Sequence, residues 1–193
     1  AIYFVGHTLG GRRTGLLAAA FLAVAVLPIQ LAHYLTVESL LTLLSTLAVC
    51  ALLWVSRSGS LRAGGLAGAL IGLALATKTS AVPLFLVAWV AWALWMLGRP
   101  GRPRLGRSAL GFALTAVAAV LIFLLAEPYS VLDWFRFAGA IAQEGAMSSG
   151  LGDVPYARQY LGTLPYLYPL EQTVLWALGL PLGLLALAGL VWL

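Results

Sequence analysis

The chain has 193 residues, of which 62% are hydrophobic and 9% are charged, and its net charge is +5. This composition excludes an ordinary soluble globular domain and indicates a protein surrounded mostly by lipid and neighbouring helices. Nucleic acid is excluded as a partner, because the basic residues occupy short segments between apolar stretches, where membrane lipid headgroups are their usual contacts. The single cysteine, Cys50, lies within an apolar stretch, so no intrachain disulfide and no cysteine metal cluster are expected.

Six apolar stretches follow one another, and each approaches the roughly 20 residues that a helix needs to cross the hydrocarbon of a membrane. They cover 15–32, 37–55, 63–77, 81–97, 109–126 and 174–193. The predicted fold class is all-α membrane: a polytopic transmembrane helix bundle with an external loop that contains an amphipathic interfacial helix. Residues 1–126 form the bundle, 127–173 the external loop, and 174–193 the start of a further span. Residues 1–9 look like the end of an earlier helix, so we expect the sequence to be a fragment.

The charged residues divide between the two sides of the membrane that this threading implies. Eight of the eleven Lys and Arg residues lie on one side, which the positive-inside rule makes cytoplasmic. All six acidic residues lie on the other side: Glu38, Glu127, Asp133, Glu144, Asp153 and Glu171. We therefore expect a polar site that faces outside, with Gly59 and Gly152 on opposite sides of the membrane.

Glycines recur at four-residue spacing in two spans. Gly64, Gly68 and Gly72 line one stripe of the third span, which allows a neighbouring helix to approach closely. Gly179 and Gly183 repeat this spacing in the last span.

Proline and tryptophan mark two other spans. Pro28 is expected to bend the first span one turn before its external end. Trp89, Trp92 and Trp95 approach the cytoplasmic end of the fourth span, where an interfacial aromatic belt is the expected role.

The segment 127–173 is too polar to span the membrane and too aromatic to be a passive linker. Ser130 and Asp133 have the spacing of a capping box, and apolar residues follow at helical spacing. They are Val131, Trp134, Phe135, Ala138, Ile141 and Ala142. We expect this helix to lie on the outer leaflet.

Glu38 and His33 flank the short external turn between the first two spans. An ionisable group at the membrane edge is costly unless it faces a wet cavity or a partner, so Glu38 is a candidate catalytic residue. The alternative is a carboxylate that only stabilises the first turn of a helix capped by Thr36. His33 is a weaker candidate for substrate binding, and the two residues alone do not make a metal site.

Lys78, the only lysine, lies in the next external turn among Thr77, Thr79 and Ser80. The preceding apolar stretch is too short to cover the hydrocarbon thickness, so the ammonium group is expected to lie below the outer surface. An ammonium group with flanking hydroxyls suits a phosphate. The alternative is a lysine that extends to the outer headgroups.

A third group of candidate residues lies in the external loop. Tyr129, Asp153, Tyr156 and Arg158 combine phenols with charges that can pair or hold an anionic headgroup. A solvated loop is the alternative for this group.

At these positions the sequence resembles the GT-C membrane glycosyltransferases, closest to bacterial protein mannosyltransferases of family 39 and aminoarabinose transferases. The resemblance is carried by 11–19, by Pro28, by the turn 33–38 and by 74–81, and in the loop by 127–129 and 153–160. It implies an enzyme of the bacterial inner membrane that transfers a sugar from a polyprenyl-phosphate donor to a protein, lipid or glycan acceptor on the extracytoplasmic face.

The resemblance also implies residue roles. Lys78 matches a lysine that contacts the carrier phosphate, and Glu38 matches a second acid, usually Asp, that helps shape the site. The principal catalytic acid of the family lies in the loop between its first two helices, expected upstream of Ala1. No cofactor is predicted, and neither the residues nor the resemblance decide whether a divalent metal is needed.

Two other functions remain open at this point. A transporter or lipid flippase would use the external charges to line a substrate path, and paired inverted repeats would favour it. A noncatalytic membrane scaffold would leave Glu38 and Lys78 without a role.

Overall fold

The computed structural model describes residues 1–98, 105–149, 155, 158–160 and 162–192. These residues form helices and turns and no strand, which confirms the predicted all-α class. The chain divides into two compact units. Unit 1 contains Ala1–Ala20 and Leu35–Pro128, and unit 2 contains Phe21–Tyr34 and Tyr129–Leu193.

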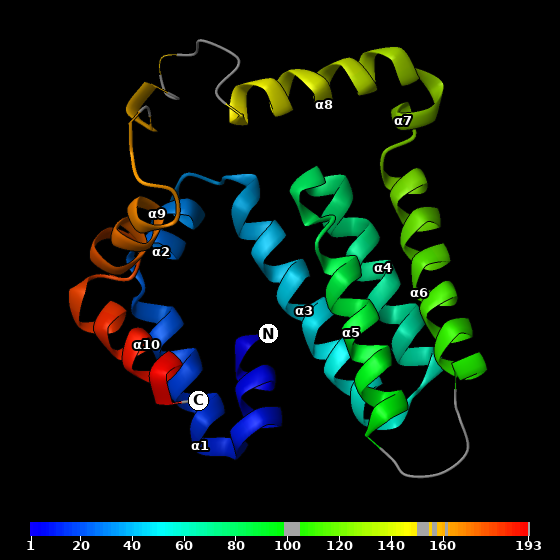
Figure 1. Cartoon of the computed structure of the whole chain (residues 1–193), viewed down its shortest axis with the longest axis horizontal. Coiled ribbons are helices and arrows are strands. Elements are labelled where there is room, and N and C mark those ends of the chain that lie inside the picture. The colour runs from blue at the N-terminus through cyan, green and yellow to red at the C-terminus, as the bar shows by residue number, and fades with distance from the viewer. Residues whose placement is uncertain (99–104, 150–154, 156–157, 161, 193) are drawn as a thin grey trace. The chain divides into compact units, whose positions relative to one another are not determined.

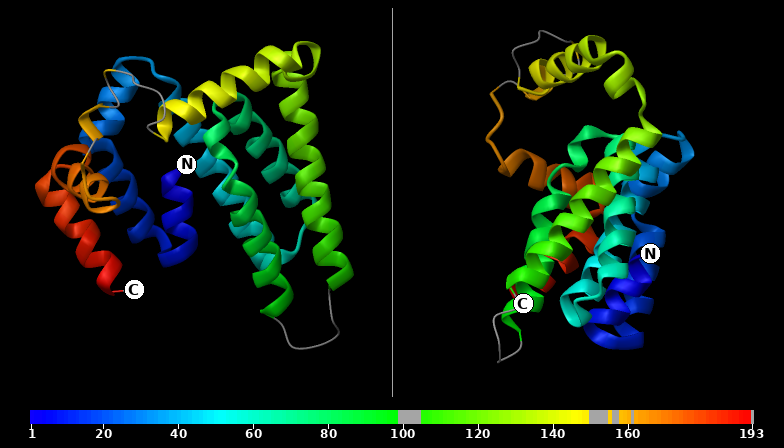
Figure 2. Two further views of the ribbon diagram at one scale, coloured as in Figure 1. Left: turned by 45° about the horizontal axis from the view of Figure 1, so that its top comes forward. Right: turned by 90° about the vertical axis from the view of Figure 1, so that its right-hand side faces the viewer.

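Four helices of unit 1 lie along one another (Figure 1, Figure 2). They are α3 (Val37–Ser58), α4 (Leu61–Thr77), α5 (Leu84–Leu97) and α6 (Leu105–Ala126). The turn from α3 to α4 is tight because Gly59 adopts a left-handed φ of 63°, which glycine tolerates without strain. A short 3₁₀ turn, η1 (Thr79–Ala81), connects α4 to α5. Helices α3 and α4 therefore form an antiparallel pair.

Three segments have the length and apolar composition of membrane-spanning helices in the described part of the chain: Val37–Ser58, Thr79–Leu97 and Leu105–Ala126. The bent pair Ile2–Val24 and Val26–His33 would be a fourth span. Helix α4, at the third predicted span, has 17 residues, and α10 (Leu180–Trp192), in the sixth, has 13. Both are shorter than the three membrane-length segments. Lys78 ends α4 because its backbone is extended, with φ −160° and ψ 130°.

The glycine stripe of α4 packs against α6, as its spacing predicts. A methyl group on Gly64 would lie 2.8 Å from the Trp92 ring, and one on Gly72 would overlap the main-chain oxygen of Ala119. Gly68 meets the Thr115 carbonyl in the same way. The absence of side chains on this stripe lets the two backbones approach closely.

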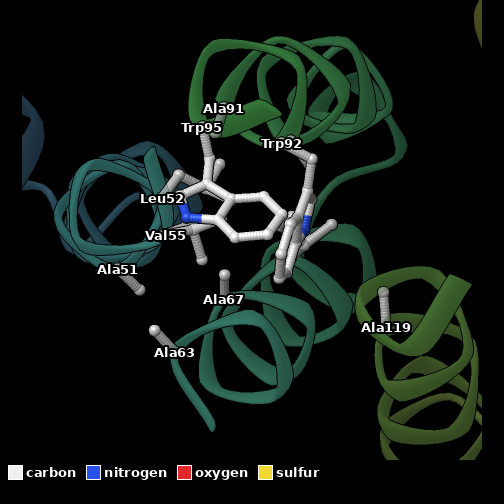
Figure 3. Packing of buried hydrophobic residues seen from close by; sticks show 12 residues of the cluster. Ala51, Leu52, Val55, Ala63, Ala67, Ala91, Trp92, Trp95 and Ala119 are labelled. Atoms are coloured by element: carbon white, nitrogen blue, oxygen red, sulfur yellow. The ribbon is translucent and has the colours of Figure 1, made fainter. Parts of the chain in front are cut away.

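The expectation for the tryptophans is wrong for two of the three. Trp92 and Trp95 are 1% and 4% exposed (Figure 3). Trp95 lies between α5 and the α3–α4 pair, and Trp92 packs against α4 and α6. They share a helix face with Ala88 and Ala91, whereas Trp89 lies outside that face and is 56% exposed. The large indoles are accommodated because the helices facing them carry small residues.

Two arginines lie at the Gly59 end of unit 1. Arg107 donates to the Gly59 carbonyl oxygen over 3.3 Å and lies 5.7 Å from the Trp95 ring. Arg57 donates to the carbonyl oxygen of Thr8. Glu38 and Lys78 lie together at the other end of the α3–α4 pair, far from Gly59. Within this unit Glu38 is therefore separated from the two arginines, as the charge pattern predicts.

Helix α1 (Ile2–Val24) reverses direction at Gly11, where φ is 83°. The backbones of Gly6 and Gly15 are in close contact across this reversal, since a methyl group on Gly6 would lie 2.9 Å from the Gly15 α carbon. A helix therefore ends at the double glycine and a second one begins, as expected for residues 1–9.

Unit 2 combines the end of α1 and α2 (Val26–His33) with six further short elements. These are α7 (Tyr129–Leu132), α8 (Trp134–Ser148), η2 (Arg158–Tyr160), α9 (Leu167–Gln172), the π-helix η3 (Thr173–Ala177) and α10 (Leu180–Trp192) among its described residues. Helices α1 and α2 meet at Ala25 with a bend of 58°. Pro28 explains the bend, because its ring clashes with the carbonyl four residues earlier and it has no N–H to donate.

The last predicted span is not one continuous helix. Gly179 has a φ of 80° and separates η3 from α10, so this glycine breaks a helix instead of packing against one. Gly183 does pack closely, against Val174. Between α1–α2 and α10 lies a cavity of about 290 Å³ with an apolar lining: Phe21, Leu22, Ala25, Pro28, Leu178, Leu182, Leu185 and Ala186.

The loop helix is confirmed, but its cap is not the predicted one. Ser130 lies buried in α7, and Asp133 caps α8 by accepting the N–H of Arg136 over 3.3 Å. The apolar face stays exposed, at 58% for Trp134 and 89% for Phe135. An exposed apolar helix face is typical of a helix at a membrane interface.

Candidate functional site

The hairpin of α3 and α4 places Glu38 and Lys78 side by side. Glu38 stands 21 residues before Gly59 and Lys78 stands 19 residues after it (59 − 38 and 78 − 59). At 1.5 Å per residue, both helices extend about 30 Å from the turn, so their far ends meet at the same level. Glu38 and Lys78 therefore lie at the same end of the hairpin.

The two side chains form an ion pair. Lys78 Nζ donates to Glu38 Oε1 over 3.2 Å, and the side chains are 34% and 37% exposed. Both charged side chains are thus partly covered and remain partly accessible. A charge-assisted hydrogen bond of this kind is stronger than one between neutral groups.

The helix ends around the pair add to its electrostatics. Glu38 lies in the first turn of α3, where the partial positive charge of the helix end favours an anion. Lys78 lies directly after α4, where the partial negative charge of a helix end favours a cation. Each ionised group is therefore supported by its own helix as well as by its partner.

The hydroxyls near Lys78 are not all directed at it. Thr77 donates its hydroxyl to the carbonyl oxygen of Leu73 in the preceding turn, over 2.9 Å. This common helical bond explains why Thr77 adds less to an anion site than its place in the sequence implies. Ser80 is exposed and Thr79 partly exposed in the η1 turn that directly follows Lys78.

The other predicted substrate-binding residues belong to unit 2 or lie outside the described residues. His33 ends α2 and is exposed, with its ring 5.5 Å from the Tyr34 ring. Tyr129 is 66% exposed at the start of α7, and Arg158 begins η2. Asp153 and Tyr156 lie outside the described residues. Their part in a common external site with Lys78 stays a prediction.

Two other kinds of site were considered: a cluster of metal ligands and the apolar cavity of unit 2. No group of three or more His, Cys, Asp or Glu side chains is arranged to hold a metal ion within the ranges that the structure describes. The side chains that line the cavity of unit 2 are all hydrocarbon, so none of them can bind a phosphate or a sugar hydroxyl. Glu38 and Lys78 are therefore the strongest candidates for polar chemistry.

The sequence carries a signal for the level of the two residues but not for their contact. Near-equal spacing of Glu38 and Lys78 from Gly59 puts them at the same level of an antiparallel helix pair, whereas the ion pair depends on how the two helices pack. The buried bond from Trp92 Nε1 to Thr115 Oγ1, 3.2 Å long, had no comparable signal.

Comparison with known proteins connects this site to a family. The family model described as dolichyl-phosphate-mannose-protein mannosyltransferase matches residues 1–140, which include the bent first span, the hairpin and the ion pair. Comparison with curated proteins and with solved structures gives no significant match. Because the match covers well over half of the chain, the chain belongs to this family of GT-C membrane glycosyltransferases, which take their sugar from a lipid-linked donor.

Proposed function

We propose that the protein transfers a sugar from a polyprenyl-phosphate donor to an acceptor hydroxyl on the extracytoplasmic face of the bacterial inner membrane. In this reaction the bond between the sugar C1 and the phosphate oxygen breaks, and a bond from C1 to the acceptor oxygen forms. The acceptor proton passes to a base, and polyprenyl phosphate leaves. The acceptor is a protein, a lipid or a glycan.

The observation that carries the proposal is the ammonium group of Lys78 at the end of α4. The departing phosphate gains negative charge in the transition state, and a fixed cation at that place stabilises it. Lys78 is held by Glu38 at 3.2 Å, so its position is set before a substrate arrives. Glu38 has the role of an assisting acid that orients the ammonium group.

The remaining candidate residues complete the proposed site. Arg158 is proposed to add positive charge near the lipid phosphate, and His33 and Tyr129 to bind the sugar or the acceptor. Asp153 and Tyr156 are proposed for the same surface. Family membership favours this transferase over a transporter or flippase, since the family is one of glycosyltransferases.

The test is the substitution Lys78→Gln in the full-length protein, reconstituted in proteoliposomes with a polyprenyl-phosphate-linked sugar. A charge-assisted hydrogen bond contributes about 1.5–3 kcal/mol. At about 1.4 kcal/mol per decade, transfer should fall about ten-fold or more. Membrane insertion should stay near normal, because losing a charge does not disfavour insertion.

Arg62→Gln is the matched control. Arg62 is exposed in the first turn of α4, at the Gly59 end of the helix that Lys78 terminates. The Arg62→Gln protein should transfer sugar at the same rate as the unmodified protein. If Lys78→Gln transfers sugar as well as the unmodified protein at limiting donor, Lys78 does not bind the phosphate and is an interfacial anchor.

A further inference from the structure

Lys78 can bind a second anion in addition to Glu38. An ammonium group has three N–H donors, and Glu38 Oε1 accepts one of them. A phosphate oxygen that takes another donor lies at hydrogen-bonding distance from the same nitrogen, and therefore about 4–5 Å from the carboxylate oxygen. The carboxylate and any phosphate on Lys78 then repel each other at close range.

The charge of the lipid differs before and after the reaction. The sugar donor is a phosphodiester with a single negative charge, whereas the released lipid is a phosphomonoester with about −1.5 to −2 charges at pH 7. A lysine alone would hold the product more strongly than the donor. With Glu38 at 3.2 Å the pair is neutral overall, so this preference for the more highly charged product is reduced.

We propose that Glu38 promotes release of the polyprenyl-phosphate product by repelling its additional negative charge. The inference rests on the proposed function, in which Lys78 binds the lipid phosphate. It assigns to Glu38 control over product release, in addition to the positioning of Lys78. Both side chains are about a third exposed (34% and 37%), so the phosphate can reach the ammonium group without the pair being separated.

The substitution Glu38→Gln tests this role. Glutamine keeps an oxygen that can accept from Lys78 and removes only the charge. The inhibition constant for added polyprenyl phosphate should fall by roughly ten-fold or more, since repulsion between unit charges 4–5 Å apart weakens binding by about five-fold in bulk water and by several hundred-fold near a protein surface. The KM for the donor should fall less, because the donor carries less charge. At high donor concentration kcat should fall as product release becomes slow.

Two further variants separate charge from structure. Glu38→Asp keeps the charge and should leave the inhibition constant within a few-fold of the unmodified value. Glu144→Gln removes a carboxylate exposed on α8 and should change nothing. The inhibition constant for inorganic phosphate should also fall in Glu38→Gln and stay nearly unchanged in the other two variants. That result would assign the effect to the phosphate headgroup and not to the lipid chain. Thermal unfolding of each variant shows whether the fold is retained.

The outcomes separate the role of Glu38 in product release from the proposed transferase function. If Glu38→Gln leaves product inhibition unchanged or weakens it, Glu38 only holds Lys78 in place and the inference is wrong. The proposed function still stands in that case, provided that Lys78→Gln relieves inhibition by polyprenyl phosphate. If polyprenyl phosphate does not inhibit the unmodified protein, or Lys78→Gln leaves that inhibition unchanged, the phosphate site itself is wrong.

Discussion

Gly68 of α4 lies against the main-chain carbonyl of Thr115 on α6. A methyl group at Gly68 would overlap that oxygen and lie 2.8 Å from Cβ of Ala118. Backbone atoms cannot move aside as a flexible side chain can, so α4 and α6 hold this spacing only with glycine at 68. Helix α4 also carries Lys78 at its end, so this contact supports the helix that positions the ion pair.

Gly68→Ala should destabilise the protein by about 1–3 kcal/mol, the usual cost of overpacking a tight interface. Gly65→Ala is the matched control, since Gly65 lies on the same helix and its methyl group would meet nothing within 4 Å. The free energy of unfolding in mixed micelles is the measurement. Equal stability of the two variants would show that α4 and α6 are not in close contact.

Thr115→Val should also destabilise the fold. Thr115 Oγ1 accepts from Trp92 Nε1 over 3.2 Å, and both residues are buried. Valine has nearly the same shape and leaves the indole N–H without this acceptor, which costs about 1–3 kcal/mol. Thr115→Ser keeps the hydroxyl and should recover most of the loss in the same unfolding measurement. A Thr115→Val protein more stable than Thr115→Ser would contradict the importance of the bond.

Topology can be tested with cysteines in a Cys50→Ser background. Gly59 is unsuitable for a label, because a side chain there would overlap the Trp95 ring, and Gly152 lies outside the described residues. Ser58 and Ser149 are exposed neighbours. Cysteines at 58 and 149 should react with a membrane-impermeant reagent from opposite sides of sealed vesicles. Reaction of both from one side would refute the threading.

The amphipathic helix should lie in the membrane interface with its apolar face toward lipid. Ala138 and Ala140 form a matched pair on α8, since two residues turn a helix by about 200°. A fluorophore on a cysteine at 138 should be quenched by brominated lipid, and one at 140 by aqueous iodide. Equal quenching of both labels by iodide would place the helix in water.

Several features followed directly from residue types and spacing. Runs of apolar residues at 37–55 and 109–126 predicted the helices that the structure has at Val37–Ser58 and Leu105–Ala126, because a helix satisfies its own backbone hydrogen bonds in lipid. Pro28 predicted the bend in the first span, since a missing N–H and a ring clash act within one turn. The glycine stripe predicted close packing for a similarly local reason: every fourth residue lies on one face.

Other features depended on which helices meet. The burial of Trp92 and Trp95 required small residues on neighbouring helices, and no pattern within α5 alone indicates it. Glycine spacing was misleading at Gly179, because the same residue type either lets helices approach or breaks one, depending on its φ. The choice between Ser130 and Asp133 as the cap of α8 likewise depended on where the chain turns after α6.

The sequence by itself determined an all-α membrane protein, the separation of its charges along the helices, and the candidacy of Glu38 and Lys78, because these follow from hydropathy and local helix geometry. Only the tertiary structure decided that the two residues form an ion pair 3.2 Å long. That contact depends on the tight left-handed turn at Gly59 and on the packing of α3 against α4, which set the register of the hairpin. Register is a property of two helices in contact, so neither helix encodes it alone.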